Sequence, residues 1–145
     1  MDEQDAKIAY ELQYYQSQAQ EIEKQISQVA ALLQENEASL AALDAVSKAG
    51  SAETLSPIGT GVFVKMKISD SKKFLVDIGG RIIAEKSAEE THAILETRKK
   101  NAESMLQKLE KSFEEAARRI QALSSAQQHA GHSHEHHGHD HEHKH

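Results

Sequence analysis

The sequence predicts an α+β fold, a long antiparallel α-helical coiled-coil hairpin with two small β-hairpins inserted at its closed end. Apolar residues recur every 3.5 residues in both halves of the chain, whereas turn and β-branched residues gather in the middle. Only 38% of the residues are hydrophobic, which suits narrow helical stripes better than a globular core. We assign residues 1–50 and 87–128 to the helices, 51–86 to the β-hairpins, and 129–145 to a disordered tail.

The first helix is predicted from about Asp5 to Lys48, with Gly50 as its C-terminal stop. Its seam keeps a period of 3.5 residues over five heptads, which random placement of apolar residues seldom does. Asn36 takes one polar place in it. The apolar seam positions are Ile8, Leu12, Tyr15, Ala19, Ile22, Ile26, Val29, Leu33, Leu40 and Leu43.

Four strands are expected in the insert. Thr54–Ile58 is short and contains Pro57, which confines it to an edge or a bulge, and Val62–Ile68 alternates in polarity. Phe74–Ile78 follows the polar turn "SDSKK", and Arg81–Glu85 follows a two-residue "GG" turn. Because an isolated hairpin is marginal in water, we expect the free strand edges to pair with other subunits.

The second helix begins at a capping box, in which Ser87 caps the Glu90 amide and the Glu90 carboxylate returns to the Ser87 amide. His92 is assigned a seam place opposite Leu43, with a packing or capping role, and Lys99 is the polar seam residue. The apolar seam positions are Leu95, Ala102, Leu106, Leu109, Phe113, Ala116, Ile120 and Leu123.

The two seams fit each other as an antiparallel pair. If paired residue numbers sum to 135, each seam position meets another, and the polar residues Asn36 and Lys99 lie opposite each other. A polar pair of this kind fixes the register of a coiled coil at some cost in stability. We therefore expect the hairpin to form within one chain.

Composition excludes several functions. The net charge is −6, and without residues 129–145 it is still −4, from 16 Lys and Arg against 20 Asp and Glu, so nucleic acid is not an expected partner. The absence of Cys excludes thiolate chemistry, and no apolar stretch could anchor the chain in a membrane. "GTG" and "IGG" lack the Lys and Ser or Thr of a phosphate loop, so we expect no enzyme and no cofactor. We expect a cytoplasmic protein.

The order helix, two β-hairpins, helix, with "LSPIGTGVFVKMKI" and "FLVDIGGRIIAEKSAEE" between the helices, resembles the prefoldin α-class subunit over about residues 5–127. The resemblance implies an archaeal-type hexamer of two α and four β subunits, whose strands join into a double β-barrel. It also implies ATP-independent capture of unfolded polypeptides and their delivery to a group II chaperonin.

This resemblance gives residues of the insert the task of assembly: Pro57, Val62, Val64, Met66, Ile68, Phe74, Val76, Ile78, Ile82 and Ile83. It makes the free helix ends the client-binding tips, with Ile8, Tyr10, Leu12, Tyr14, Tyr15, Phe113, Ile120 and Leu123 as candidates. Tyr10 and Tyr14 fall outside the seam, where they are either client contacts or ordinary surface aromatics. For Ile120 and Leu123 we favour the seam role.

The tail holds nine of the ten histidines and is not part of the prefoldin pattern. Imidazoles at this density bind Ni²⁺, Zn²⁺ or Cu²⁺. The tail is therefore interpreted as a native segment that sequesters metal, a native segment with no metal role that binds metal only adventitiously, or, less favoured, an engineered purification tag. The alternatives to a chaperone are a coiled-coil scaffold or adaptor and a metal-buffering protein. The candidate ligands are His132, His134, His136, His137, His139, His141 and His143.

Overall fold

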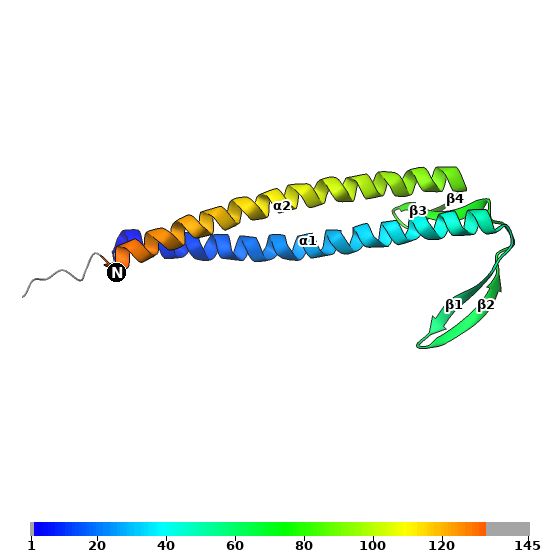
Figure 1. Cartoon of the computed structure of the whole chain (residues 1–145), viewed down its shortest axis with the longest axis horizontal. Coiled ribbons are helices and arrows are strands. Elements are labelled where there is room, and N and C mark those ends of the chain that lie inside the picture. The colour runs from blue at the N-terminus through cyan, green and yellow to red at the C-terminus, as the bar shows by residue number, and fades with distance from the viewer. Residues whose placement is uncertain (1, 133–145) are drawn as a thin grey trace, which may run out of the picture. The chain divides into compact units, whose positions relative to one another are not determined.

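The computed structural model describes residues 2–132, and it confirms two long helices with two antiparallel β-hairpins between them (Figure 1). The chain divides into two compact units, which we describe separately. One contains the residues up to Gln28 and those from Gln107 onward, and the other is Val29–Leu106. The elements are α1 Glu3–Ala49, β1 Glu53–Gly59, β2 Val62–Lys67, β3 Lys73–Gly79, β4 Ile82–Ser87 and α2 Ala88–His132.

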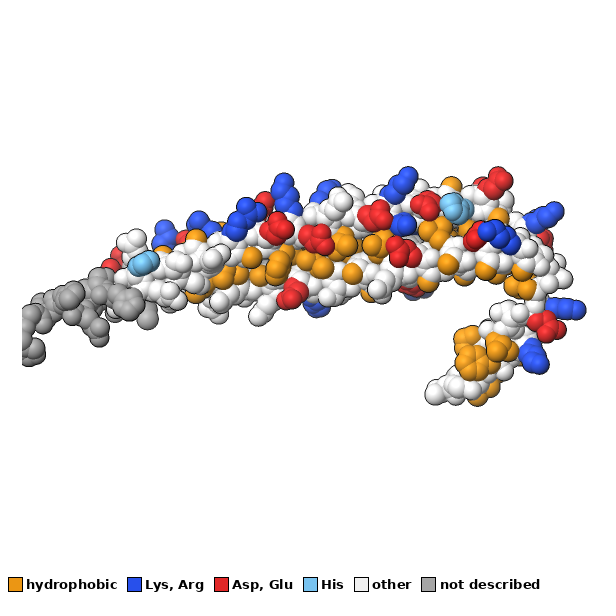
Figure 2. All heavy atoms as spheres, viewed as in Figure 1, with side chains coloured by type: hydrophobic (Ala, Val, Ile, Leu, Met, Phe, Trp, Pro, Cys, Tyr) orange, Lys and Arg blue, Asp and Glu red, His pale blue; other side chains and the backbone are white. Residues whose placement is uncertain are grey.

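The predicted seam is confirmed, because every seam residue assigned from Ile8 to Leu43 and from Leu95 to Leu123 is buried or half-buried. Hydrophobic side chains follow the line where the helices meet, and charged ones lie outside it (Figure 2). The register is confirmed in each unit. Glu37 lies 3.9 Å from Lys99, and the Arg119 guanidinium lies 5.8 Å from the Tyr15 ring centre, pairs whose numbers sum to 136 and 134.

Both helix boundaries in the middle of the chain have local causes. Gly50 follows α1 with a φ of 68°, a conformation that a residue without Cβ adopts at little cost. At the start of α2 the Ser87 Oγ accepts a hydrogen bond of 3.1 Å from the Glu90 amide, as predicted. The second half of the capping box is not formed. The Glu90 carboxylate instead lies 3.6 Å from the Lys86 ammonium.

Two other assignments on α2 are corrected. Thr91, and not His92, is the buried residue one turn before Leu95, and its hydroxyl donates to the Ser87 carbonyl at 2.7 Å. His92 is exposed and lies 4.0 Å from the Glu96 carboxylate. The helix also continues to His132, beyond its expected end at residue 128, and includes Gly131 in its last turn. Residues 133–145 of the predicted tail lie outside the described residues.

The two β-hairpins are repeats of one unit, twenty residues apart. Strand β1 pairs with β2, and β3 with β4, in the same register, and each pairing in the first recurs in the second at numbers twenty higher. Leu55, Ile58 and Gly59 recur as Leu75, Ile78 and Gly79. In both hairpins the isoleucine is the extra residue of a bulge just before the turn.

The turn between β3 and β4 corrects the predicted strand that began at Arg81. Gly80 and Arg81 both have positive φ, 59° and 63°, as the two central residues of a type I′ turn require. Arg81 is thus a turn residue and β4 begins at Ile82, while Gly79 still pairs with Ile82.

Candidate functional site

Both faces of the β1–β2 hairpin expose apolar side chains (Figure 2). Cross-strand pairing defines the two faces. The Val64 face consists of Thr54, Ser56, Val62, Val64 and Met66, and the Leu55 face consists of Glu53, Leu55, Pro57, Phe63, Lys65 and Lys67. A two-stranded sheet in water with both faces uncovered is marginal. This hairpin therefore leaves both of its apolar faces open to a contact outside the chain.

The β3–β4 hairpin differs, because one of its faces is covered by its own chain. Val76 is only 7% exposed and shares a cavity of about 380 Å³ with Leu43, Val46, Thr91 and Leu95 of the helices. Burial of a valine side chain contributes about 2 kcal/mol, so this contact holds the hairpin to the helices. The covered face, the Val76 face, comprises Phe74, Val76, Ile82, Ala84 and Lys86.

The opposite face of this hairpin is exposed. It consists of Lys73, Leu75, Asp77, Ile83 and Glu85, and we call it the Leu75 face. Leu75, which lies in the stretch 74–78 predicted for assembly, is 75% exposed, the largest value among the exposed hydrophobic side chains of the described residues. Phe74 and Val76, which were predicted, are half-buried and buried. The alternation of the strand identified the two faces but not which one the helices cover.

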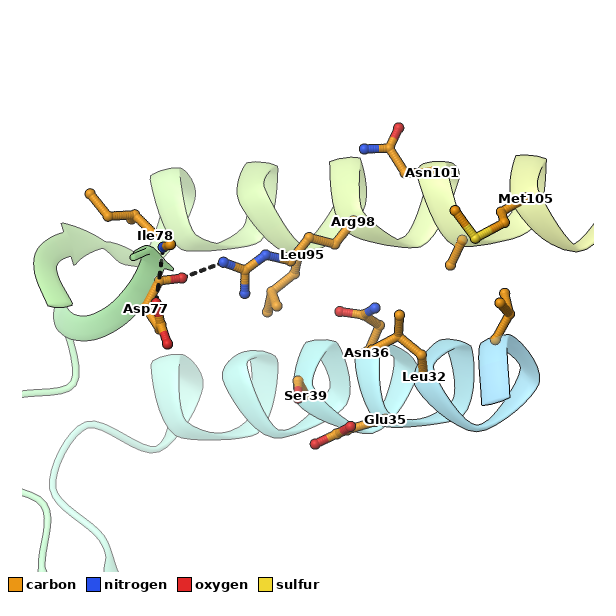
Figure 3. A pocket seen from close by; sticks show the side chains of 13 residues that line it. Leu32, Glu35, Asn36, Ser39, Asp77, Ile78, Leu95, Arg98, Asn101 and Met105 are labelled. Atoms are coloured by element: carbon orange, nitrogen blue, oxygen red, sulfur yellow. Dashed lines mark hydrogen bonds between the residues drawn. The ribbon is translucent and has the colours of Figure 1, made fainter. Parts of the chain in front are cut away.

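An arginine of α2 holds the end of this hairpin. The Arg98 guanidinium donates a hydrogen bond to the backbone carbonyl of Asp77, and the Asp77 carboxylate accepts from the Gly79 amide at 2.9 Å (Figure 3). The Asp77 carboxylate thereby holds the turn between β3 and β4, and Arg98 holds this turn beside α2. No sequence pattern indicated this contact, because it joins residues 21 apart on different elements.

An open groove of about 640 Å³ lies between α1, α2 and the β3–β4 turn (Figure 3). Its floor includes Asn36, which is 7% exposed and points between the helices, and its rim includes the exposed Leu32 and Met105. Asn36 therefore occupies the seam as predicted, whereas Lys99 extends to Glu37. In addition to Asp77, the charged side chains that line this groove are Glu35 and Arg98.

A pair of opposite charges crosses the Leu75 face. The Lys73 ammonium lies 3.1 Å from the Glu85 carboxylate. The hydrogen bond to Glu85, its negative charge and that of Asp70 raise the pKa of Lys73, so this lysine is charged at neutral pH. Both side chains remain more than half exposed, which leaves them accessible to a partner.

The predicted tip residues divide into two groups. Tyr10 and Tyr14 are exposed, as expected from their places outside the seam, and the Tyr14 hydroxyl accepts a hydrogen bond of 2.9 Å from Gln18. Tyr15 is half-buried below Arg119, whose guanidinium also lies 3.9 Å from the Glu11 carboxylate. The others are half-buried or, at Leu123, buried in the seam: Ile8, Leu12, Phe113, Ile120 and Leu123.

Of the predicted metal ligands, only His132 falls within residues 2–132, at the last position of α2, and the other six lie outside the described residues. Within the described part of the chain, no three His, Asp or Glu side chains gather into a set that could hold a metal ion. No helix of residues 2–132 combines the length and the apolar character needed to cross a membrane.

Together, a coiled-coil hairpin and two partly uncovered β-hairpins between its helices define the class of fold. A sequence model of the prefoldin subunit family matches residues 15–132. Proteins called prefoldin subunit alpha are similar to this chain over most of their length. That of Archaeoglobus fulgidus is 31% identical, covering 81% of this chain and 89% of its own, and that of Thermofilum pendens is 28% identical, covering 83% and 94%.

The structure of filamentous PFD from Methanocaldococcus jannaschii, determined by cryo-EM, superposes with a TM-score of 0.69 at 25% sequence identity. The alignment covers 81% of this chain and 98% of that one. The chain belongs to the prefoldin family, and the relatives place it with the archaeal alpha subunits.

Replacing Arg98 with alanine should loosen the β3–β4 hairpin without unfolding α2. Loss of the hydrogen bond to the Asp77 carbonyl removes about 1 kcal/mol from local stability, so amides of residues 73–87 should exchange roughly fivefold faster. Hydrogen–deuterium exchange measured by mass spectrometry checks this. Arg118→Ala, at an exposed arginine that faces Glu114, is the matched control. Unchanged exchange in 73–87 would show that Arg98 does not hold the hairpin.

Proposed function

We propose that this chain is a subunit of a hetero-oligomeric, ATP-independent chaperone that binds unfolded polypeptides in the cytoplasm. The observation that carries the proposal is a prefoldin-family chain whose β1–β2 hairpin exposes apolar side chains on both faces. Such a hairpin is stable only when other strands or side chains cover it, so the subunit acts as part of an assembly. The partners proposed are prefoldin β subunits, two α with four β, whose strands complete a β-barrel.

Clients would bind at the free ends of the helices. Tyr10 and Tyr14 lie exposed near the start of α1 and have no place in the seam, so their rings are available to a non-native chain. Several weak apolar contacts suit a surface that must accept many unrelated sequences. Release to a group II chaperonin then needs no chemical step, and we propose no catalytic residue and no cofactor for this activity.

A scaffold or adaptor that uses its strands only to dimerise is the alternative. A dimer of this kind requires one hairpin, whereas this chain has two, and both of them expose apolar side chains. The amount of uncovered strand surface favours a larger assembly over a simple dimer.

We also propose a metal-binding property for the C-terminal segment, supported by its nine histidines in 17 residues. Neutral imidazoles are ligands for Ni²⁺, Zn²⁺ and Cu²⁺, and Glu135, Asp140 and Glu142 add carboxylate oxygens. The chaperone function does not depend on this property.

Mixing the chain with a prefoldin β subunit encoded in the same genome should give a hexamer of two and four subunits. Native mass spectrometry of each subunit alone and of the mixture checks the expectation. The mixture, without ATP, should also suppress aggregation of a chemically denatured client followed by light scattering. A chain whose mass stays unchanged after mixing would favour the scaffold alternative.

Replacing both Tyr10 and Tyr14 with serine should weaken client capture and leave assembly intact. Loss of two exposed rings removes apolar contact area, and we expect roughly twofold or more chaperone to be needed for equal suppression of aggregation. Leu32→Ser is the matched control, because Leu32 and Tyr14 are both 51% exposed and Leu32 belongs to the other unit. Equal suppression by the double variant and the wild type, with both hexamers intact, contradicts the role of the tyrosines.

Full-length protein should bind Ni²⁺ and Zn²⁺, and a chain truncated after residue 128 should not. Isothermal titration calorimetry of both proteins measures this difference. Because only deprotonated imidazole coordinates a metal, binding should weaken as the pH falls below about 6. Equal heats from the two proteins would exclude the segment as the site. Equal aggregation suppression with and without it would confirm that the two properties are separate.

A further inference from the structure

The groove between α1, α2 and the β3–β4 turn contains a buried polar group that the fold does not satisfy. Asn36 on its floor is 7% exposed, and among residues 2–132 its side-chain amide makes no hydrogen bond. No fully buried side-chain nitrogen or oxygen in this part of the chain lacks a partner, so the Asn36 amide reaches the groove surface. Figure 3 shows it directed between the helices. Such an amide costs free energy until a group from outside the chain bonds to it.

The residue expected opposite Asn36 does not supply this bond. The Lys99 ammonium instead lies 3.9 Å from the Glu37 carboxylate. A polar residue in a coiled-coil seam normally sets the register by pairing with a polar residue across the seam. Because Asn36 has no such partner in the described chain, pairing across the seam does not account for an amide at the floor of the groove.

Arg98 is the charged side chain that faces the same space. Its guanidinium donates to the Asp77 carbonyl, and within residues 2–132 no carboxylate lies within 4.0 Å of it. The three charges of the lining sum to −1, but Glu35 points away from α2, and the Asp77 carboxylate accepts from the Gly79 amide (Figure 3). The hairpin end of the groove therefore keeps an unpaired positive charge with N–H donors to spare.

Apolar side chains supply the rest of the binding surface. Ile78 lies near Arg98, and Leu32 and Met105 lie farther along the groove on facing helices (Figure 3). These three side chains are about half exposed. Arg98 and Met105 are seven residues apart on α2, which is about 10 Å along the helix. An extended chain spans that distance in about three residues.

We propose that this groove binds an extended peptide segment of a partner protein, with an acidic side chain at Arg98 and an apolar one at Leu32 and Met105. An extended segment has free backbone N–H and C=O groups, and the Asn36 amide can bond to both. A docked helix would leave this amide unsatisfied, because its backbone groups bond within the helix. A carboxylate beside Arg98 gains a charge-assisted hydrogen bond. The groove volume of about 640 Å³ suits a ligand of this size.

This site goes beyond the proposed capture of clients and does not depend on it. The groove consists of residues from the unit Val29–Leu106, whereas Tyr10 and Tyr14 belong to the other unit. A client surface must accept unrelated sequences, whereas the groove discriminates by charge at one position and by apolar contact at another.

Fluorescence anisotropy of the full chain with short labelled peptides tests the chemical preference. The probe LVTETVL carries glutamate three places from a leucine on either side, so both chain directions are sampled. We expect saturable binding, about threefold weaker for LVTQTVL and weaker again for LVTKTVL, since the charge pair with Arg98 is lost and then reversed. Equal affinity for the three peptides, or no saturable binding, would overturn the proposal.

Two variants separate the two polar contacts. Asn36→Leu suits a seam position, so the helices stay paired while the amide is lost, and affinity for LVTETVL should fall about fivefold. Ala19→Leu, at a seam position of the other unit, is its control. Arg98→Glu should reverse the preference in favour of LVTKTVL. A merely loosened hairpin would weaken both peptides without reversing their order, and that result would contradict the charge contact. Arg118→Glu, which makes the same charge change, should keep the wild-type order.

Methionine methyl NMR locates the bound peptide, because the chain has only three methionines: Met1, Met66 and Met105. LVTETVL should shift the Met105 methyl signal and leave that of Met66, on the exposed β1–β2 hairpin, unchanged. A shift at Met66 without one at Met105 would assign the binding to the exposed strands and reject the groove. Sedimentation velocity completes the test. If the peptide dissociates a dimer, a second copy occupies the groove, and the assignment to a partner protein is overturned.

Discussion

The register of the helix seam is the constraint on which the other features depend. Among the described residues only six hydrophobic side chains are classed as buried, and none is less than 2% exposed, so there is no globular core to position the strands. All of these buried side chains except Val76 of β3 lie along the seam, and ion pairs such as Glu37 with Lys99 lie beside it. Since pairing fixes which residues of α1 and α2 face each other, it also fixes where the chain leaves one helix and enters the next.

The two hairpins share one strand register, but only the second packs on the helices. Residues Phe74 and Val76 occupy the places that Thr54 and Ser56 have in the first repeat. The apolar pair gives β3 a surface that packs on Leu43 and Leu95 in the same chain. Threonine and serine give β1 no comparable driving force, because their side chains carry little apolar area and a hydroxyl that water satisfies. The second hairpin is therefore anchored to the helices and the first is left for an external contact.

The sequence predicted those features that follow from periodicity or from a local cap. A period of 3.5 identified the seam, and Ser87 and Gly50 marked the helix boundaries, because these signals act within a few residues. It assigned His92 to the seam in place of Thr91, which is the neighbouring residue, and the burial of Thr91 beside Leu43 became evident only from the packing.

Features that depend on tertiary context were missed for related reasons. A "GG" pair suggests a turn made of glycines, yet the turn lies one residue later and Arg81 adopts a positive φ within a type I′ hairpin. Both faces of β3 carry apolar residues, so alternation alone does not show which face the helices cover. The repeat of Leu55, Ile58 and Gly59 at a spacing of twenty was a usable signal for equivalent hairpins.

Exposed apolar strands are a hazard for any free subunit, and the charges on these hairpins limit that hazard. The charged residue paired with each exposed leucine, Lys65 with Leu55 and Glu85 with Leu75, disfavours the direct stacking of two identical faces. A partner that covered both hairpins would remove the hazard, because it would take the exposed leucines out of water.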